Sequence, residues 1–305
     1  MEGTVKAGRK PSSEMTTGKW KRAVAPYLFV LPNLLIFTVF IVVPAIFGLL
    51  YSFAKYDGLN PMKFIGLRNY TKVFTTPDFW SAFGKSVEYV VISVPLIYVC
   101  SLAIALILSR ELAGKGFFRS VFYWPTLISY IIVGLTWKWI FSDSFGIMNY
   151  LLGLAGIEPV QWLTDPFHAK MTIIVATVWS RLGFYMVIFI AGLQAIPQDY
   201  YEAATLDGAS KARSFWSITL PLLKPTSVLV VMLSVIEAFK AYPLMKALTG
   251  GGPGKETTYV VQYIYQIGFD KQDLGLASAM SVVLLVIIAG LSVIQLKLTK
   301  GGGAS

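Results

Sequence analysis

The stretch that decides the fold class is AVAPYLFVLPNLLIFTVFIVVPAIFGLLYSFA, residues 23–54, which carries no charge in 32 positions. A helix that spans the hydrocarbon core of a bilayer needs about 20 mostly apolar residues. A secretory signal peptide has an apolar region of only about 7 to 15 residues, followed by a small-residue cleavage site. This run is far longer and no such site follows it. We therefore expect a helix that stays in the membrane.

Five further stretches have the same character, some without charge and others interrupted by one to three charged residues. The sequence predicts an all-α membrane protein with six transmembrane helices, in a transmembrane domain of residues 23–298. The expected spans are 23–54, 84–109, 120–142, 171–195, 218–245 and 274–297. A basic tail, residues 1–22, precedes them, and a Gly-rich tail, residues 299–305, is expected to be flexible.

The composition excludes soluble and disordered proteins. Of the 305 residues, 55% are hydrophobic and 14% are charged, whereas soluble domains have about a quarter charged residues. The net charge of +10 fits either a nucleic-acid partner or a membrane surface. Thirteen Lys and Arg lie in segments on the side of the N-terminal tail and seven on the other. The positive-inside rule then predicts cytoplasmic termini. This topology accounts for the excess of basic residues without a nucleic-acid partner.

The residues required for common catalytic and metal sites are missing from the sequence. The single cysteine, Cys100, rules out an internal disulfide, and one histidine, His168, cannot build a zinc site. Gly84-Lys85-Ser86 lacks the upstream glycine of a nucleotide-binding P-loop, where Phe79 stands. We expect no catalytic residue, metal or cofactor in this chain, and an enzyme only as a membrane hydrolase of unrecognised type.

The loop of residues 196–217, between the fourth and fifth spans, has the pattern of two short helices around a hinge. Pro197 suits a first helical position, and Glu202 favours the N-terminal half of a helix dipole. Gly208 can take the left-handed conformation that ends a helix, and Ser210 can cap the next one. Such a helix can enter a groove on another protein or lie as an ordinary amphipathic helix at the membrane surface. These residues alone leave both open.

The loop reads E-A-A-x-x-D-G-A, then F-x-x-I-x-L-P-x-x-x-P. It resembles the EAA loop of the permease subunits of binding-protein-dependent ABC importers. The resemblance implies a type I importer fold and makes the loop a coupling helix that docks in an ATPase subunit. The matching anchors are Glu202, Ala203, Ala204, Asp207, Gly208, Ala209, Phe215, Ile218, Leu220, Pro221 and Pro225. The implied coupling residues are Tyr201, Glu202, Ala203, Ala204, Asp207, Gly208 and Ala209. Glu202 would pair with a basic residue of the ATPase.

Further motifs resemble the sugar and glycerol-phosphate permeases of the maltose-transporter class. They are Leu31-Pro32-Asn33, FIGLRNY at 64–70, Phe79-Trp80, Trp162-Leu163, Asp165-Pro166 and LTGGGP at 248–253. The resemblance implies a carbohydrate substrate, a second permease, two ATPase subunits that bind ATP and Mg, an extracytoplasmic binding protein, and a bacterial cytoplasmic membrane. Pro243 departs from the pattern, because relatives more often have an acidic residue there. Substrate contacts in the fifth span are therefore not carried over.

Charges inside the expected spans mark a candidate substrate path. A charge at the centre of a span costs about 2.5–3.5 kcal/mol, so Glu237 and Lys240 should face a protein interior or a wet cavity. At a spacing of three they share one helical face, either as a structural pair or as a lining of the path. Arg181 either lines the same path or extends its charge to the interface. The candidate path residues are Arg181, Tyr185, Glu237, Lys240 and Tyr242.

The Gly-rich turn of residues 249–254 is expected on the outer face. It is either a simple loop breaker or a place where the backbone approaches a docked binding protein, through Gly251, Gly252 and Pro253. Two alternatives to an importer permease remain at this point. One is a secondary transporter that uses Glu237 for ion coupling, and the other is a membrane-embedded structural partner without a path of its own.

Overall fold

The computed structural model describes residues 14–110 and 112–300, with side chains described for 26–110 and 112–297. Residues 1–13 of the predicted basic tail and 301–305 of the Gly-rich tail lie outside the described residues, so the flexibility expected of the Gly-rich tail stays a prediction there. Residues 14–22 and 299–300 are helical. The chain divides into two compact units, residues 1–51 and 52–305. Each unit is described here on its own.

The first unit is helical throughout its described part. It contains α1 (Glu14–Phe37), a π-helical segment (Thr38–Val42) and most of α2 (Val43–Ser52). The stretch Pro26–Ser52 is long and apolar enough to cross a membrane, which agrees with the expected first span.

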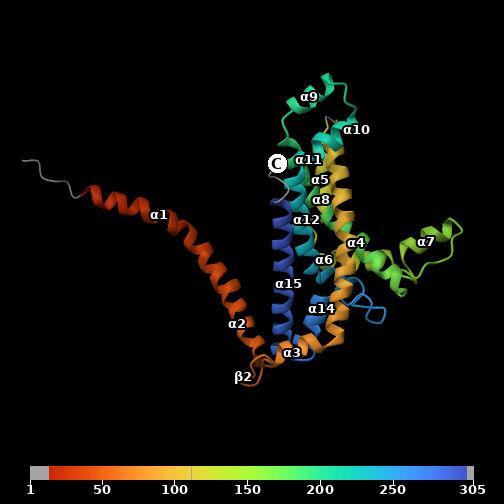
Figure 1. Cartoon of the computed structure of the whole chain (residues 1–305). Coiled ribbons are helices and arrows are strands. Elements are labelled where there is room, and N and C mark those ends of the chain that lie inside the picture. Colours follow the sequence, from red (N-terminus) through yellow and green to blue (C-terminus); the bar gives the residue numbers. More distant parts are fainter. Residues whose placement is uncertain (1–13, 111, 301–305) are drawn as a thin grey trace, which may run out of the picture. The chain divides into compact units, whose positions relative to one another are not determined.

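The second unit begins with a two-stranded antiparallel ladder, β1 (Ala54–Lys55) and β2 (Lys63–Phe64), and is otherwise helical (Figure 1). Its α-helices are α3 (Arg68–Thr75), α4 (Pro77–Leu108), α5 (Lys115–Tyr123), α6 (Tyr130–Ile140), α7 (Ile147–Leu154), α8 (Pro166–Gln194), α9 (Asp199–Leu206), α10 (Lys211–Ser214), α11 (Leu220–Leu222), α12 (Lys224–Phe239), α13 (Pro243–Leu248), α14 (Val260–Tyr265) and α15 (Leu274–Lys300). A 3₁₀ turn (Trp124–Leu127) and π-helical segments (Phe215–Thr219 and Gln266–Asp270) complete it.

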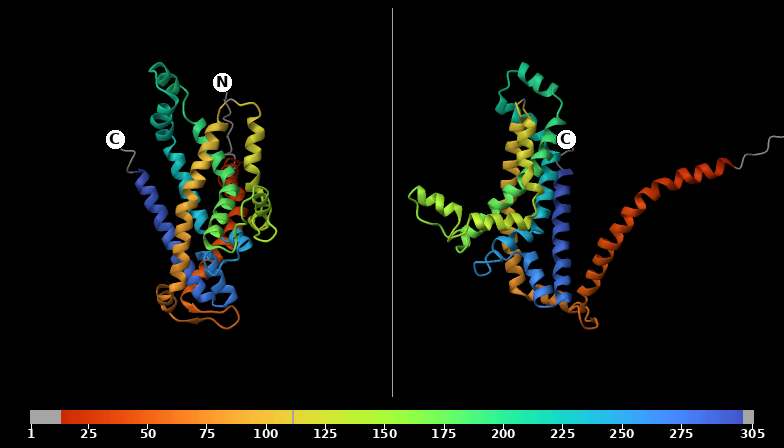
Figure 2. Two further views of the ribbon diagram at one scale, coloured as in Figure 1. Left: turned by 90° about the vertical axis from the view of Figure 1, so that its right-hand side faces the viewer. Right: turned by 180° about the vertical axis from the view of Figure 1, so that it is seen from behind.

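The centre of the second unit is the packing of α4 against α8 and α12, and α12 also contacts α15 (Figure 2). The buried residues of α4 recur every three or four positions, which gives the helix one packed face and leaves the others for lipid or partners. Small polar residues on that face bind the neighbouring backbone. The Ser101 hydroxyl donates to the Leu182 carbonyl oxygen of α8 at 3.1 Å. Such side chains let membrane helices approach closely.

Two of the six expected spans are broken helices. In the described part of the chain, four helices are each long and apolar enough to cross a membrane, and two bent pairs raise the number to six. Lys115–Leu127 and Tyr130–Ile140 bend by 98°, and Lys211–Leu222 and Lys224–Phe239 bend by 66°. The expectation of a continuous helix over 120–142 is therefore wrong. Pro125 lies in the 3₁₀ turn before the break, and a proline has no N–H to continue a helical ladder.

The fifth span also ends early. The expected helix to residue 245 stops at Phe239, and a new helix, α13, begins at Pro243. A residue before proline avoids the helical region, and Tyr242 has φ −142°. The departure at Pro243 is thus the first residue of a separate short helix.

Two other spans begin earlier than expected, both at a proline in the first helical turn. These are α4, at Pro77 instead of residue 84, and α8, at Pro166 instead of residue 171. The Asp165 carboxylate caps α8 by accepting from the His168 N–H at 3.0 Å. This hydrogen bond also lowers the pKa of Asp165. The longer α8 places Arg181 near its middle instead of close to one end, and this position favours the path over extension of the charge to an interface.

Candidate functional site

The predicted coupling segment lies at one end of the second unit, beyond the ends of the long helices (Figure 1). Helix α9 ends in a turn in which the Gly208 N–H donates to the Thr205 carbonyl and the Ala209 N–H to the Ala204 carbonyl. This pair of bonds is the Schellman motif, and Gly208 has the expected left-handed conformation with φ +74°. The Ser210 hydroxyl accepts from the Arg213 N–H and caps α10, also as expected.

The surface of this segment that faces away from the long helices is exposed and accessible to a partner. Glu202, Ala203, Asp207 and Gly208 are exposed, and the Leu206 side chain is 89% exposed. Tyr201 differs from them, because its hydroxyl forms a 2.9 Å hydrogen bond with the Thr219 hydroxyl. Tyr201 therefore connects α9 to the segment that leads into α12.

The five candidate path residues meet at one cavity between the helices. Arg181 and Tyr185 come from α8, Glu237 from α12, and Lys240 and Tyr242 from the break before α13. The cavity has a volume of about 70 Å³, enough for a few water molecules and too small for a sugar. This cavity by itself is therefore not a path of substrate size, and the contact of these residues with substrate stays a prediction.

Arg181 is the main partner of Glu237. Its Nη2 lies 2.8 Å from Glu237 Oε2, whereas Lys240 Nζ lies 3.6 Å from Glu237 Oε1 and its side chain is 62% exposed. The Arg181 guanidinium also stacks over the Tyr130 ring, 4.3 Å from its centroid. Glu237 therefore has two cationic neighbours, and its expected ion pair with Lys240 is weaker than its ion pair with Arg181.

The Gly-rich turn is tightly held. Gly251 is buried with φ +105°, and a Cβ there would lie 2.6 Å from the Thr258 hydroxyl oxygen. The Thr257 hydroxyl donates to the Gly252 carbonyl at 2.6 Å. Gly251 is required by this turn and does not itself form surface, so Gly252 and Pro253 are the accessible members of the predicted docking set.

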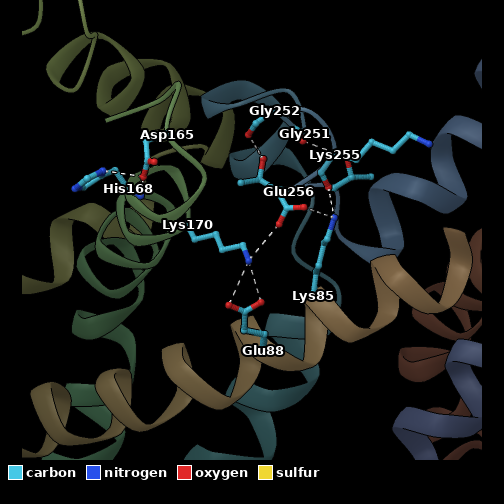
Figure 3. Close-up of polar contacts among 11 residues, drawn as sticks. Lys85, Glu88, Asp165, His168, Lys170, Gly251, Gly252, Lys255 and Glu256 are labelled. Carbon is cyan, nitrogen blue, oxygen red and sulfur yellow. Dashed lines mark hydrogen bonds and ion pairs between the residues drawn. The ribbon is translucent and has the colours of Figure 1, made fainter. Parts of the chain in front are cut away.

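Ion pairs that the sequence analysis missed anchor this turn to two long helices (Figure 3). Glu256 lies between Lys85 of α4, at 3.3 Å, and Lys170 of α8, at 3.4 Å. Lys170 also pairs with Glu88 at 3.1 Å, and the Lys85 ammonium donates to the Lys255 carbonyl. The adjacent Lys85 holds the pKa of Glu256 below its ordinary value, with Lys170 adding to the effect. From the sequence alone, Lys85 and Glu88 could be placed close together, because they lie three positions apart in one expected helix, whereas Lys170 and Glu256 are distant in sequence.

Two motifs that carry the family resemblance have structural roles here. In FIGLRNY, the Asn69 amide donates to the carbonyl oxygens of Ser52 and Ala54, at 3.0 and 2.8 Å. In the Trp162-Leu163 motif, the indole N–H donates to Asn149 at 2.8 Å and the Leu163 N–H to the Asp143 carboxylate at 3.0 Å. These contacts fix the loops outside the long helices.

Comparison with known families supports the resemblance. Residues 17–300 match the family described as binding-protein-dependent transport system inner membrane component. The chain belongs to this family. The permease is thus a membrane transport subunit and not itself an enzyme. The alternative of a secondary transporter is set aside because the relatives are permease subunits of ABC importers, among them a probable ABC transporter permease protein of Bacillus subtilis that is 35% identical over 284 residues, covering 92% of this chain and 97% of that protein.

Relatives of the permease include sugar and glycerol-phosphate transporters. It is 37% identical over 283 residues to the trehalose/maltose transport system permease protein of Thermococcus litoralis, covering 92% of this chain and 96% of that protein. It is 33% identical over 281 residues to the sn-glycerol-3-phosphate transport system permease protein of Brucella abortus, covering 91% and 95%. The predicted maltose and glycerol-phosphate class is confirmed by these relatives.

The fold of the permease matches a solved importer. A chain of a bacterial ABC transporter involved in the import of alginate superposes with a TM-score of 0.81 at 23% identity, covering 95% of this chain and all of that one. The predicted all-α type I importer fold is confirmed.

Proposed function

We propose that this permease carries a carbohydrate of oligosaccharide size and is driven by ATP hydrolysis in two partner ATPase subunits, which hold ATP and Mg. The substrate class is supported by the Thermococcus litoralis relative, which is a trehalose/maltose transport system permease protein. A second, similar permease would complete the path, because the cavity around Arg181 and Glu237 is too small for a sugar. An extracytoplasmic binding protein would deliver the substrate.

The observation that carries this proposal is the exposed helix α9, which ends in the Schellman turn at Gly208 and bears the E-A-A-x-x-D-G-A pattern. Closure of the ATP-bound subunits would push on α9, and Tyr201 would pass the displacement to Thr219 and α12. The six helical spans then rock between states open to opposite sides. Glu202, Ala203, Ala204, Asp207 and Ala209 form the docking face in this proposal.

The proposal also fixes the orientation. The α9 end and both termini lie in the cytoplasm, as the distribution of Lys and Arg indicates. The Gly252 and Pro253 turn then faces the binding protein, held in position by Lys85, Lys170 and Glu256. The protein resides in the cytoplasmic membrane, among lipids.

The test is the ATPase activity of the reconstituted importer, with and without the sugar-loaded binding protein. Glu202→Lys places a positive charge against the expected basic site and should abolish stimulation while leaving assembly intact. The matched control is Glu158→Lys, a charge reversal at an exposed residue remote in sequence from α9. Full stimulation in the Glu202→Lys variant would remove α9 from the coupling mechanism.

A further inference from the structure

A second cavity, of about 690 Å³, lies at the opposite end of the second unit from α9, where β1, β2 and α3 meet the turn before α15 (Figure 1). It shares no lining residue with the cavity around Arg181. Its volume lies in the range of about 300–1,000 Å³ that is typical of small-molecule sites. Its basic lining residues are Lys55, Lys63, Arg68, Lys72 and Lys271.

The acidic side chains of this cavity do not neutralise the basic ones. Its two carboxylates are those of Asp57 and Asp273. Asp57 accepts hydrogen bonds from the backbone N–H of Asn60, from the Asn60 side-chain amide and from the Leu59 N–H, which together lower the pKa of Asp57 to about 2. Asp273 accepts from the Leu276 N–H at the start of α15. Among the side chains of residues 26–110 and 112–297, none forms a hydrogen bond or ion pair with the five basic groups, so the cavity has an uncompensated positive charge.

Two of these lysines are forced together by the strand register. Lys55 and Lys63 are directly opposite each other in the antiparallel ladder of β1 and β2. Like charges at such positions, with Cβ atoms about 4.5–5.5 Å apart, destabilise a ladder. The backbone there is nevertheless fixed, because Asn69 holds the Ala54 carbonyl from α3. An anion between the two ammonium groups would remove the repulsion.

The cavity lies close to the ends of two predicted spans. Lys55 follows the end of α2 by three residues, and Lys271 precedes the start of α15 by three. Leu59 and Phe64, in the same segment, have side chains that are 81% and 79% exposed. Basic groups attract the phosphate of an anionic headgroup, and exposed apolar side chains beside them suit its acyl chains, although the best-known clusters of this kind lie on the cytoplasmic side of a span.

The distribution of charge points the same way. Of the seven Lys and Arg expected on the outer side, five gather at this cavity. Outer loops are depleted in these residues by the positive-inside rule, so their concentration at one place is not explained by topology. We propose that this cavity is a binding site for a phosphate-type anion, either the phosphate of an anionic lipid headgroup in the adjoining leaflet or a free phosphate group.

The test measures melting temperature against ligand concentration for the purified full-length chain. One arm adds inorganic phosphate, with chloride at equal ionic strength as the reference. The other arm compares nanodiscs of phosphatidylcholine with nanodiscs that also contain phosphatidylglycerol. We expect a melting temperature that rises with the anion, and Lys55→Gln/Lys63→Gln should weaken the apparent affinity by about tenfold or more, since charged hydrogen bonds are lost.

The matched control is Lys138→Gln/Lys246→Gln, which removes two exposed lysines outside the cavity and should leave the response unchanged. Lys271→Gln removes the basic group that the turn before α15 contributes to the cavity. It should weaken the rise in melting temperature without altering the ladder of β1 and β2. A response to phosphatidylglycerol alone assigns the lipid headgroup, and a response to inorganic phosphate identifies a free anion as sufficient. The proposal is overturned if neither probe raises the melting temperature, or if the Lys55→Gln/Lys63→Gln variant responds like the parent. None of these outcomes bears on sugar transport, so this proposal and the proposed function fail separately.

Discussion

Replacing Glu237 with glutamine is expected to destabilise the second unit by about 2 kcal/mol, because it leaves the Arg181 charge without its main partner. Removing one member of a fully buried ion pair costs about 3–5 kcal/mol. The Arg181 and Glu237 side chains are 20% and 40% exposed, so solvent screening lowers that figure. Lys240→Gln should cost less than about 1 kcal/mol, since Lys240 is 62% exposed and 3.6 Å from Glu237.

The assay is the free energy of unfolding in lipid bicelles, measured by titration with sodium dodecyl sulfate for both single variants. The double variant Arg181→Gln/Glu237→Gln removes both charges and should recover most of the stability. Equal losses for Lys240→Gln and Glu237→Gln would refute the assignment of Arg181 as the main partner. Sugar uptake by the double variant shows whether the ion pair is only structural or also lines the substrate path. We expect stable protein that does not transport sugar. Transport at the parental rate would exclude the fifth span from the path.

Three further predictions concern the rest of the chain. Gly208→Val should strain the left-handed turn and reduce sugar-stimulated ATP hydrolysis, whereas Gly208→Asn, which tolerates that conformation, should keep most of it; equal activity in the two would exclude the turn from coupling. Because the pKa of Glu256 is lowered from 4.5, its ion pairs stabilise the fold fully above that value and lose this contribution as pH falls through the lowered pKa. Below about pH 4.5, the melting temperature of Glu256→Gln should therefore fall less steeply with falling pH than that of the parent, and equal slopes for the two proteins would contradict this. A reporter fused after Gly208 should read cytoplasmic and one within residues 143–169 external; the reverse would overturn the topology.

Local chemistry made much of the fold predictable. The left-handed Gly208, the Ser210 cap and the apolar runs each depend on neighbours within a few positions, so the sequence contains their cause. The break before Pro243 has an equally local cause, since a proline starts α13. The apolar composition of residues 218–245 nevertheless predicts one continuous span, because composition alone does not reveal the break.

Contacts between distant segments could not be predicted in the same way. Arg181 and Glu237 are 56 positions apart, and their pairing depends on how α8 packs beside α12. Glu256 reaches Lys85 and Lys170 only because the Gly-rich turn folds back onto α4 and α8. Charge type indicated that such residues needed partners, and the packing of the helices decided which partners they have.

The energy source of uptake tests the central claim most directly. Inside-out and right-side-out vesicles that contain the complete importer would be loaded with ATP or with a non-hydrolysable analogue, in the presence and absence of an ionophore. Radiolabelled oligosaccharide and its binding protein would be supplied from the face opposite α9. The account predicts accumulation that requires hydrolysable ATP on the α9 side and survives the ionophore. Accumulation without ATP that the ionophore abolishes would contradict it.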